Sequence, residues 1–453
     1  MSDVVAHGLG GIQDLPVPRW LFYWGAAVVL LASFALLGTL WRRPLLARHA
    51  RGSALPATPS RLVLGPVRIA AQVTSVGLFA LVWVAALLGD PDAFRNLAPT
   101  WIYVVFWLGV PALSVLLGNV WRALSPWRAL ADGFVWAWER GGRTARPLAA
   151  YPERAGRWPA AAALLAFSAL ELAYAEPASP RALAFAIALY TYLALFGMVA
   201  FGRRTWEERG EGFAVLFAYL ARIAPLHAVD GRVRVRWPLT GLAGPDQVPG
   251  SVGVVAVMLG SVLFDGYSRT TTWQDLLAEI EGPFLLDRPE VGELLVSLAN
   301  LGGLLAGVAL VGLAYLAACA VARALVRAPR SLAPEFVLSL VPIAFVYLVA
   351  HYFSLFVVQG QYTIPLLSDP LGRGWDVLGT AAWAPNLTPL SPNTVWYVQV
   401  GALVVGHVAG LAVAHDRAID LFEQRRAAMR SQYAMLALMV LYTVGGLWVL
   451  SRG

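Results

Sequence analysis

A segment in the second half of the chain, Asp265–Trp273, carries the densest group of reactive side chains in the sequence. It reads DGYSRTTTW and directly follows an apolar stretch. Asp265 can accept a proton or bind a metal, and Arg269 can hold a phosphoryl or carboxylate oxygen. We predict that both are catalytic and that Tyr267 and Ser268 belong to a substrate pocket. The alternative is that Asp265 and Arg269, four residues apart, only pair with each other at a helix end.

A second group of polar residues lies in and after a later apolar stretch. His351 lies about two turns before the end of that stretch, and we predict that it is a catalytic base. Asp265 and His351, with His7 as a third ligand from the same side, are also the residues that we expect to hold a divalent metal, if one binds. The residues expected to converge on the pocket from this group are His351, Tyr352, Gln359, Gln361 and Tyr362.

Two further ionisable residues, Glu171 and His407, lie inside apolar stretches, where such groups are costly and usually face a cavity, a partner or a pathway. For His407 the alternative is a buried histidine that hydrogen-bonds across a seam of small residues, Ala402, Gly406, Gly410 and Ala414, with Gly303 and Gly307 as the facing pair. Haem held by His351 and His407 is disfavoured, because their depths differ by roughly 10 Å.

The elements that must position these residues are ten apolar stretches, read as membrane-spanning helices. They lie at 20–41, 66–89, 100–118, 158–175, 181–202, 250–264, 292–321, 334–358, 393–415 and 431–450. All but seven of the 34 basic residues fall in alternate loops, which the positive-inside rule assigns to the cytoplasm. Both termini are therefore expected outside, in a single polytopic domain covering 1–453.

The composition agrees with an all-α integral membrane protein, since 58% of the residues are hydrophobic and 13% are charged. The net charge of +7 arises from arginines placed for membrane insertion and anionic lipid, so it does not indicate nucleic-acid binding. The single cysteine, Cys319, allows no disulfide framework and is expected to be a small buried residue.

Four segments lie outside the spans. An extracytoplasmic tail covers 1–19. A cytoplasmic insertion, 203–249, is expected to hold an interfacial amphipathic helix near 213–223 and a hairpin turning at Asp230-Gly231, with an arginine face that either binds phosphate headgroups or is simply solvated. An outer loop, 266–291, has capping-box spacing at Thr272 and Asp275 and predicts a short helix. A second outer loop, 359–393, resembles a lid.

The chain resembles polytopic bacterial membrane proteins called fenitrothion hydrolases over nearly its whole length. The residues that carry the resemblance are AHGLGG at 6–11, DLPVPRWL at 14–21, the Asp265–Trp273 segment, WYVQV at 396–400, Gly406-His407 and AHDR at 414–417. The resemblance implies a hydrolase, in the inner or plasma membrane, that releases a phenol from an organophosphorus triester.

Three functions remain open at this point. A hydrolase would use His351 or Asp265 to activate water, with Arg269 stabilising the developing negative charge. A proton-coupled transporter or channel would use Glu171, Asp265, His351 and His407 as a path. An accessory or assembly subunit would bind a protein partner, or a second copy of itself, through its outer loops. The other expected partners are membrane lipids and a small apolar substrate.

Overall fold

The computed structural model describes residues 19–142 and 144–450, so His7 and all but the last residue of the predicted outer tail lie outside the described part. The described chain is mostly helical. Each of the ten apolar stretches forms a helix or part of one. The long elements are α1 (Arg19–Leu40), α4 (Arg68–Leu88), η3 (Trp101–Gly109) with α6 (Val110–Leu117), α9 (Trp158–Leu172), α10 (Pro180–Phe201), α13 (Ser251–Ser268), α15 (Pro289–Val326), α17 (Val341–Gln359), α19 (Pro392–Leu421) and α21 (Tyr433–Leu450).

Seven helices in the described residues are long and apolar enough to cross a membrane. They are Ala57–Leu88, Leu97–Leu117, Pro180–Phe201, Ser251–Ser268, Pro289–Val326, Ala333–Ser368 and Pro392–Leu421. The helix α9 is not among them, because its 15 residues rise only about 22 Å. The architecture is that of an all-α, multi-pass membrane protein.

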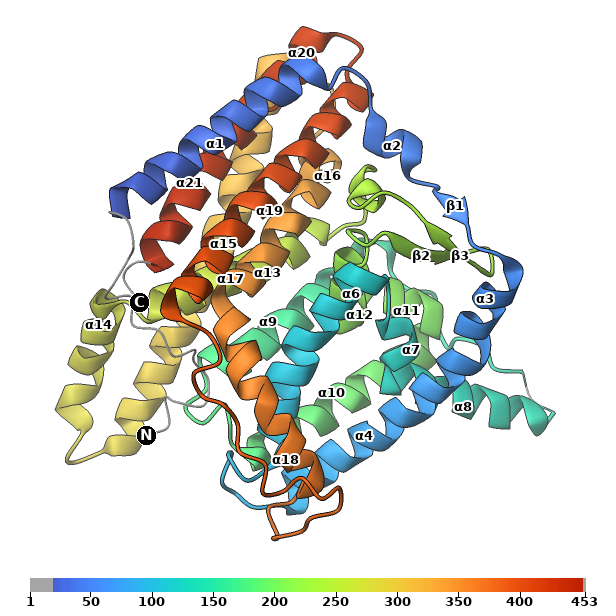
Figure 1. Cartoon of the computed structure of the whole chain (residues 1–453), viewed down its shortest axis with the longest axis vertical. Coiled ribbons are helices and arrows are strands. Elements are labelled where there is room, and N and C mark those ends of the chain that lie inside the picture. The colour runs from blue at the N-terminus through green and yellow to red at the C-terminus, as the bar shows by residue number, and fades with distance from the viewer. Residues whose placement is uncertain (1–18, 143, 451–453) are drawn as a thin grey trace.

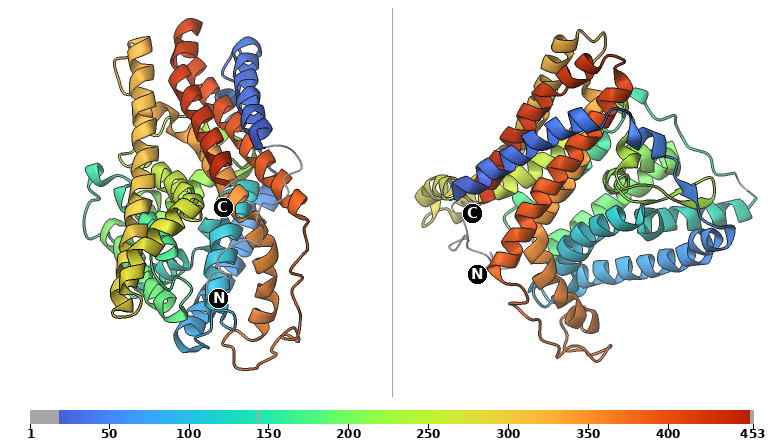
Figure 2. Two further views of the ribbon diagram at one scale, coloured as in Figure 1. Left: turned by 90° about the vertical axis from the view of Figure 1, so that its left-hand side faces the viewer. Right: turned by 45° about the horizontal axis from the view of Figure 1, so that its top comes forward.

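The helices form two groups that meet along α13 and α17 (Figure 1). One group packs α1, α13, α15, α17, α19 and α21 side by side, and both views in Figure 2 keep the first helix beside the last. The other group contains α4, α6, α9 and α10, together with α8 (Pro126–Arg140), α11 (Arg203–Arg209) and α12 (Gly212–Leu220). The candidate residues at 171, 265 and 351 lie on helices at the junction between the groups.

Small residues allow two close helix contacts in the first group. A Cβ on Gly260 of α13 would lie 2.5 Å from the Cα of Val308 on α15, so these backbones touch. On α19, Gly406 and Gly410 instead face Val346 and the carbonyl of Ser339. The predicted pairing of the α19 seam with Gly303 and Gly307 is therefore wrong: the small residues of α15 pack on α13. Sequence spacing shows which face of a helix carries small residues, but it does not show which neighbouring helix packs against that face.

The segment 203–249, predicted to be a cytoplasmic insertion, differs from its prediction in one element. The helix α12 is buried on all sides, with Phe217 and Tyr219 almost inaccessible, and it packs on α6 and α9 instead of lying at a membrane surface. Its sequence, GFAVLFAYL, has no polar face, and a helix that is apolar all round is buried in protein. The interfacial amphipathic helix was thus a wrong prediction.

The predicted hairpin is present as β2 (Leu226–Val229) and β3 (Arg232–Val235), which turn at Asp230 and Gly231 with positive φ at both residues. A third strand, β1 (Ser53–Ala54), adds to β3 in the order β1-β3-β2. Arg234 of the arginine face donates to the carbonyls of Arg51 and Gly52. That side chain therefore ties the hairpin to the segment after α1.

The two loops predicted to lie outside, 266–291 and 359–393, both contain helix. The short helix predicted after Asp265 is α14 (Thr271–Glu281), but its N-cap is Thr270, whose side chain makes no cap hydrogen bond. The capping box proposed at Thr272 and Asp275 was therefore a wrong prediction. In the second loop α17 is followed by α18 (Thr363–Ser368), and the chain beyond it pairs with the loop after α4. The amide of Asp90 donates to the carbonyl of Leu371 at 2.8 Å.

Candidate functional site

Asp265 lies in the last turn of α13 and is the centre of a polar network. Its side chain is 1% exposed, because α13 packs against α9, α15 and α17 at once. A carboxylate in such surroundings is stable only when donors reach its oxygens. Three side chains supply them: His351, Tyr352 and Arg269.

Two consecutive residues of α17 reach the same oxygen of Asp265. The Nε2 of His351 lies 2.7 Å from Oδ2, and the hydroxyl of Tyr352 donates to Oδ2 at 2.6 Å. Because a carboxylate accepts, this contact places a proton on Nε2 of His351, which leaves Nδ1 of the neutral imidazole as an acceptor. The network therefore selects the tautomer of the histidine.

Arg269 pairs with the other oxygen, Oδ1 of Asp265, at 2.9 Å. This is the helix-end pair that the four-residue spacing allowed, and it coexists with the convergence of α17 on the same carboxylate. The side chain of Arg269 is 30% exposed and that of His351 is 15% exposed. Asp265 is thus shielded from solvent, whereas Arg269 and His351 are partly exposed to it.

Glu171 of α9 extends the network to a third helix. Its Oε1 lies 3.2 Å from the Tyr352 hydroxyl. That hydroxyl has one proton, which it donates in the shorter hydrogen bond, to Asp265. The contact to Glu171 is then a hydrogen bond only if Glu171 carries a proton and donates it. One continuous chain of hydrogen-bonding groups thus runs from Glu171 through Tyr352 and Asp265 to His351.

Five of the predicted pocket residues lie elsewhere. Tyr267 packs its ring on Trp273, with centroids 5.7 Å apart, and the Ser268 hydroxyl donates to the backbone carbonyl of Asp265. Gln359 is eight residues beyond His351 on α17, a rise of about 12 Å. Tyr362 packs against the apolar cluster around Val82 and Leu97. Gln361 instead bonds Asn386 in the following loop. The placements of Gln359, Gln361 and Tyr362 follow from the helical rise of α17, which carries its C-terminal end away from Asp265.

The structure offers no metal site within the described residues, since no group of three His, Cys, Asp or Glu side chains lies close enough to hold an ion. Asp265 and His351, two of the predicted ligands, bond directly to each other. The third, His7, lies outside the described residues.

His407 is fully buried on α19. Its Nδ1 lies 2.8 Å from the carbonyl of Leu403, one turn back on the same helix, so the bond does not cross the seam as predicted. Its ring packs edge-on against Tyr347, while His351 is bound to Asp265. Each histidine proposed as a haem ligand thus has a protein partner for one ring nitrogen. His415 is also buried, against Gln432 and the carbonyl of Trp41.

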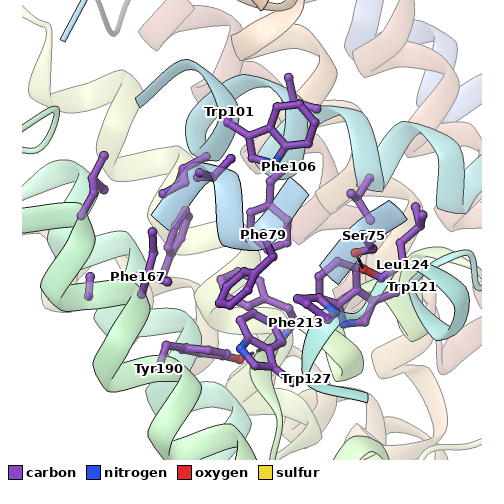
Figure 3. A pocket seen from close by; sticks show the side chains of 18 of the residues that line it. Ser75, Phe79, Trp101, Phe106, Trp121, Leu124, Trp127, Phe167, Tyr190 and Phe213 are labelled. Carbon is purple, nitrogen blue, oxygen red and sulfur yellow. Dashed lines mark hydrogen bonds between the residues drawn. The ribbon is translucent and has the colours of Figure 1, made fainter. Parts of the chain in front are cut away.

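A large apolar cavity in the second helix group had no counterpart in the sequence analysis. Its volume is about 2150 Å³, and its walls come mainly from α4, η3, α6, α9 and α10. Figure 3 shows Phe79, Phe106 and Phe213 pointing into the same space, with Trp127 and Tyr190 at one end. Apolar residues facing such a cavity have the same sequence pattern as residues facing lipid, so only the fold reveals it.

Two carboxylates, Glu176 and Glu211, border this cavity, and Glu211 is the N-cap of α12. It accepts from the amides of Phe213 and Ala214, at 3.0 and 2.8 Å, and from the Tyr190 hydroxyl. Burial raises the pKa of Glu211 to about 7, although these donors act in the opposite direction. Glu211 is thus a fully bonded helix cap and not a free base.

Comparison of the chain with protein-family models, curated proteins and solved structures found no match.

Proposed function

We propose that this protein is a bacterial cell-membrane protein with ten spanning helices and both termini on the outer side. The support is the distribution of arginines between alternate loops, together with the helical state of all ten apolar stretches. In this orientation α13 ends on the outer side, so Asp265 and its partners lie in the outer half of the membrane domain.

Within that topology, we propose that the Asp265 network is the active site of a hydrolase, with His351 as the general base. The observation that carries this proposal is the 2.7 Å contact between Asp265 Oδ2 and His351 Nε2. A buried carboxylate that fixes one ring nitrogen of a partly exposed histidine leaves the other nitrogen to take a proton from water. The resemblance noted above suggests an organophosphorus triester as the substrate.

The roles of the residues then differ from those first assigned. Both oxygens of Asp265 already accept hydrogen bonds, so Asp265 is a positioning residue and His351 is the base. His351 takes a proton from water as the water oxygen bonds to phosphorus and the phosphorus–aryloxide bond breaks. The aryloxide takes that proton and leaves as a phenol. Arg269, paired with Asp265, can direct its remaining N–H groups to the developing charge.

The test is phenol release from an aryl organophosphorus triester by purified protein. We expect His351→Ala to lower turnover by about a hundredfold to ten-thousandfold, the usual contribution of a general base. Asp265→Asn should lower it comparably, because the tautomer of His351 is no longer selected. His227→Ala, on the partly buried strand β2 and outside the Asp265 network, is the matched control. Equal turnover in all four proteins would remove the hydrolase proposal, and chelator sensitivity would add a metal to it.

Proton-coupled transport is the second candidate, favoured by the continuous chain from Glu171 through Tyr352 and Asp265 to His351. A void of about 30 Å³, enough for a water molecule, lies inward of this chain beside Ser168, Ser261 and Trp107. Proton flux in proteoliposomes that disappears in Tyr352→Phe, with no phenol release from any protein, would support transport over hydrolysis. Retention of flux in Tyr352→Phe would oppose it.

A further inference from the structure

Four arginines lie within two residues of Val67, Trp121, Trp127 or Phe201, which line the apolar cavity. They lie on the first turn of α4, on α7 (Trp121–Leu124), near the start of α8 and at the start of α11. Two carboxylates neutralise part of the charge: Arg128 pairs with Glu207 at 2.9 Å, and Arg203 pairs with Asp132. Among the described residues no ion pair engages the other two. The four are Arg68, Arg122, Arg128 and Arg203.

The guanidinium groups are close enough to repel one another. Burial lowers the pKa of Arg203, and the nearby Arg128, Arg68 and Arg122 lower it further, against the effect of Glu207. Four positive charges thus face two negative ones in a partly buried space. This imbalance favours a bound anion.

Several donors in this group are buried and have no hydrogen-bond partner within the described residues, although the Nε of Arg128 lies 3.9 Å from a carboxylate oxygen of Asp132. They are the Nε of Arg68, the Nε of Arg128 and the Nε2 of Gln72. Arg68 and Gln72 are four residues apart on α4 and therefore lie on one face. A buried donor without an acceptor costs about 1–3 kcal/mol, so a ligand with several acceptor oxygens would be favoured here. A phosphate group has this chemistry.

The arginines are next to the cavity wall in sequence. Val67 and Trp127, which precede Arg68 and Arg128, line the cavity, as does Trp206 of α11. From there the cavity follows α4 as far as Val82, a rise of about 22 Å, which approaches the roughly 30 Å hydrocarbon core of a bilayer. Its 2150 Å³ also exceeds the roughly 300–1,000 Å³ of small-molecule pockets. Its length and apolar walls suit acyl chains.

We propose that this cavity binds an anionic phospholipid of the cytoplasmic leaflet, with its acyl chains along α4, α6 and α10 and its phosphate held by the four arginines. The choice of leaflet rests on the proposed topology. The site is separate from the Asp265 network and does not depend on hydrolysis.

The headgroup is tested by titrating phosphatidylglycerol into purified protein in a nonionic detergent and following the rise in Tm, with phosphatidylcholine as the comparator without net charge. We expect phosphatidylglycerol to bind more tightly. Arg68→Gln and Arg203→Gln should each weaken the affinity for phosphatidylglycerol on the order of fivefold, which is the effect of one basic residue near a lipid phosphate. Arg204→Gln is the matched control, because that side chain is 87% exposed and pairs with Glu208 on the helix surface.

The acyl chains are tested by filling the cavity. Ala186 of α10 lines it, whereas Ala309 lies on an exposed face of α15. Ala186→Trp should abolish the stabilisation by phosphatidylglycerol, and Ala309→Trp should leave it intact. The unmodified protein gives a second measurement: after detergent exchange it should retain more phosphatidylglycerol than phosphatidylcholine from an equimolar mixture.

Equal stabilisation by the two lipids, or unchanged binding in both arginine variants, would overturn the proposal. Inorganic phosphate is used to test whether the arginines bind a free phosphate ion instead of a lipid phosphate. If it raises Tm as much as phosphatidylglycerol does, and Ala186→Trp has no effect, the arginines bind a free anion and the cavity is not a lipid site.

Discussion

Two aspartates of this protein, Asp265 and Asp416, are buried to the same degree but have different kinds of partner. Asp416, near the inner end of α19, accepts from the indole of Trp41 and from the amides of Leu46 and Ala47, all at 3.0–3.1 Å. These donors do not titrate. The partners of Asp265 are a histidine, a tyrosine and an arginine, two of them partly exposed. Burial of a carboxylate therefore does not distinguish a structural site from a reactive one, whereas the chemistry of its donors does.

The sharpest test of this contrast is the loss of Asp416. Asp416→Ala leaves two backbone amides and an indole N–H without acceptors at the corner between α1 and α2 (Leu45–His49). We expect a loss of roughly 3–5 kcal/mol in the free energy of unfolding. Thermal unfolding in detergent measures it. A loss below 1 kcal/mol would show that Asp416 does not hold this corner.

Asp265→Asn should have the opposite profile, with a large effect on turnover and a smaller one on stability. Arg269 and His351 can be hydrated when the charge is removed, since both are partly exposed. We expect a stability loss of about 1–2 kcal/mol, against the turnover loss of a hundredfold or more given above. Unfolding and phenol release are measured on the same preparation. If Asp265→Asn destabilises as strongly as Asp416→Ala, the contrast between the two aspartates fails.

A third buried carboxylate, Asp246, extends the comparison to pH. It accepts from Arg157 and, at 2.8 Å, from the Tyr219 hydroxyl. Burial alone would raise the pKa of Asp246, but Arg157 and Tyr219 hold that pKa below its usual value. The ionised Asp246 therefore stabilises the fold at any pH above its pKa in the unfolded chain, about 4. This stabilisation is lost as the pH falls through the lower pKa of Asp246 in the folded protein.

We expect Tm to fall in this acid range, and Asp246→Asn to reduce the fall while lowering stability by roughly 1–2 kcal/mol at neutral pH. A Tm profile from pH 6 down to pH 2.5 measures both effects. An identical acid profile in the variant would assign the acid sensitivity to other carboxylates.

The smallest effect should come from Tyr352→Phe. The ring is retained, so the loss in stability should stay near 1 kcal/mol, the value of one hydrogen bond. Glu171 is separated from Asp265, however, so the pH dependence of turnover should change even if its maximum falls only a few-fold. A pH–rate profile measures this change. A profile that matches the parent protein would exclude Glu171 from the working network.

Sequence reasoning found the pair of Asp265 and Arg269 because both lie on one helix, where spacing determines contact. It also placed His351 and Tyr352 near them from depth alone. It could not find the role of Asp416, because the donors come from residues 41–47, far away in the sequence. The same limit applies to the glycine seams and to the cavity, both of which depend on which helices are neighbours.

The burial of α12 is a different case, since its all-apolar composition already indicated it. The hairpin at Asp230-Gly231 was predictable because its turn is local. The added strand β1 was not, because it pairs residues 53–54 with residues 234–235.

The packing of α1 against α19 and α21 has a consequence for biosynthesis. The first helix is synthesised long before these neighbours exist. At a synthesis rate of roughly 5–20 residues per second, the nearly 400 residues between α1 and α21 take about 20–80 s. During this interval α1 cannot complete its packing, and the corner held by Asp416 must wait for α19. The helix α1 is thus made early but reaches its final contacts late.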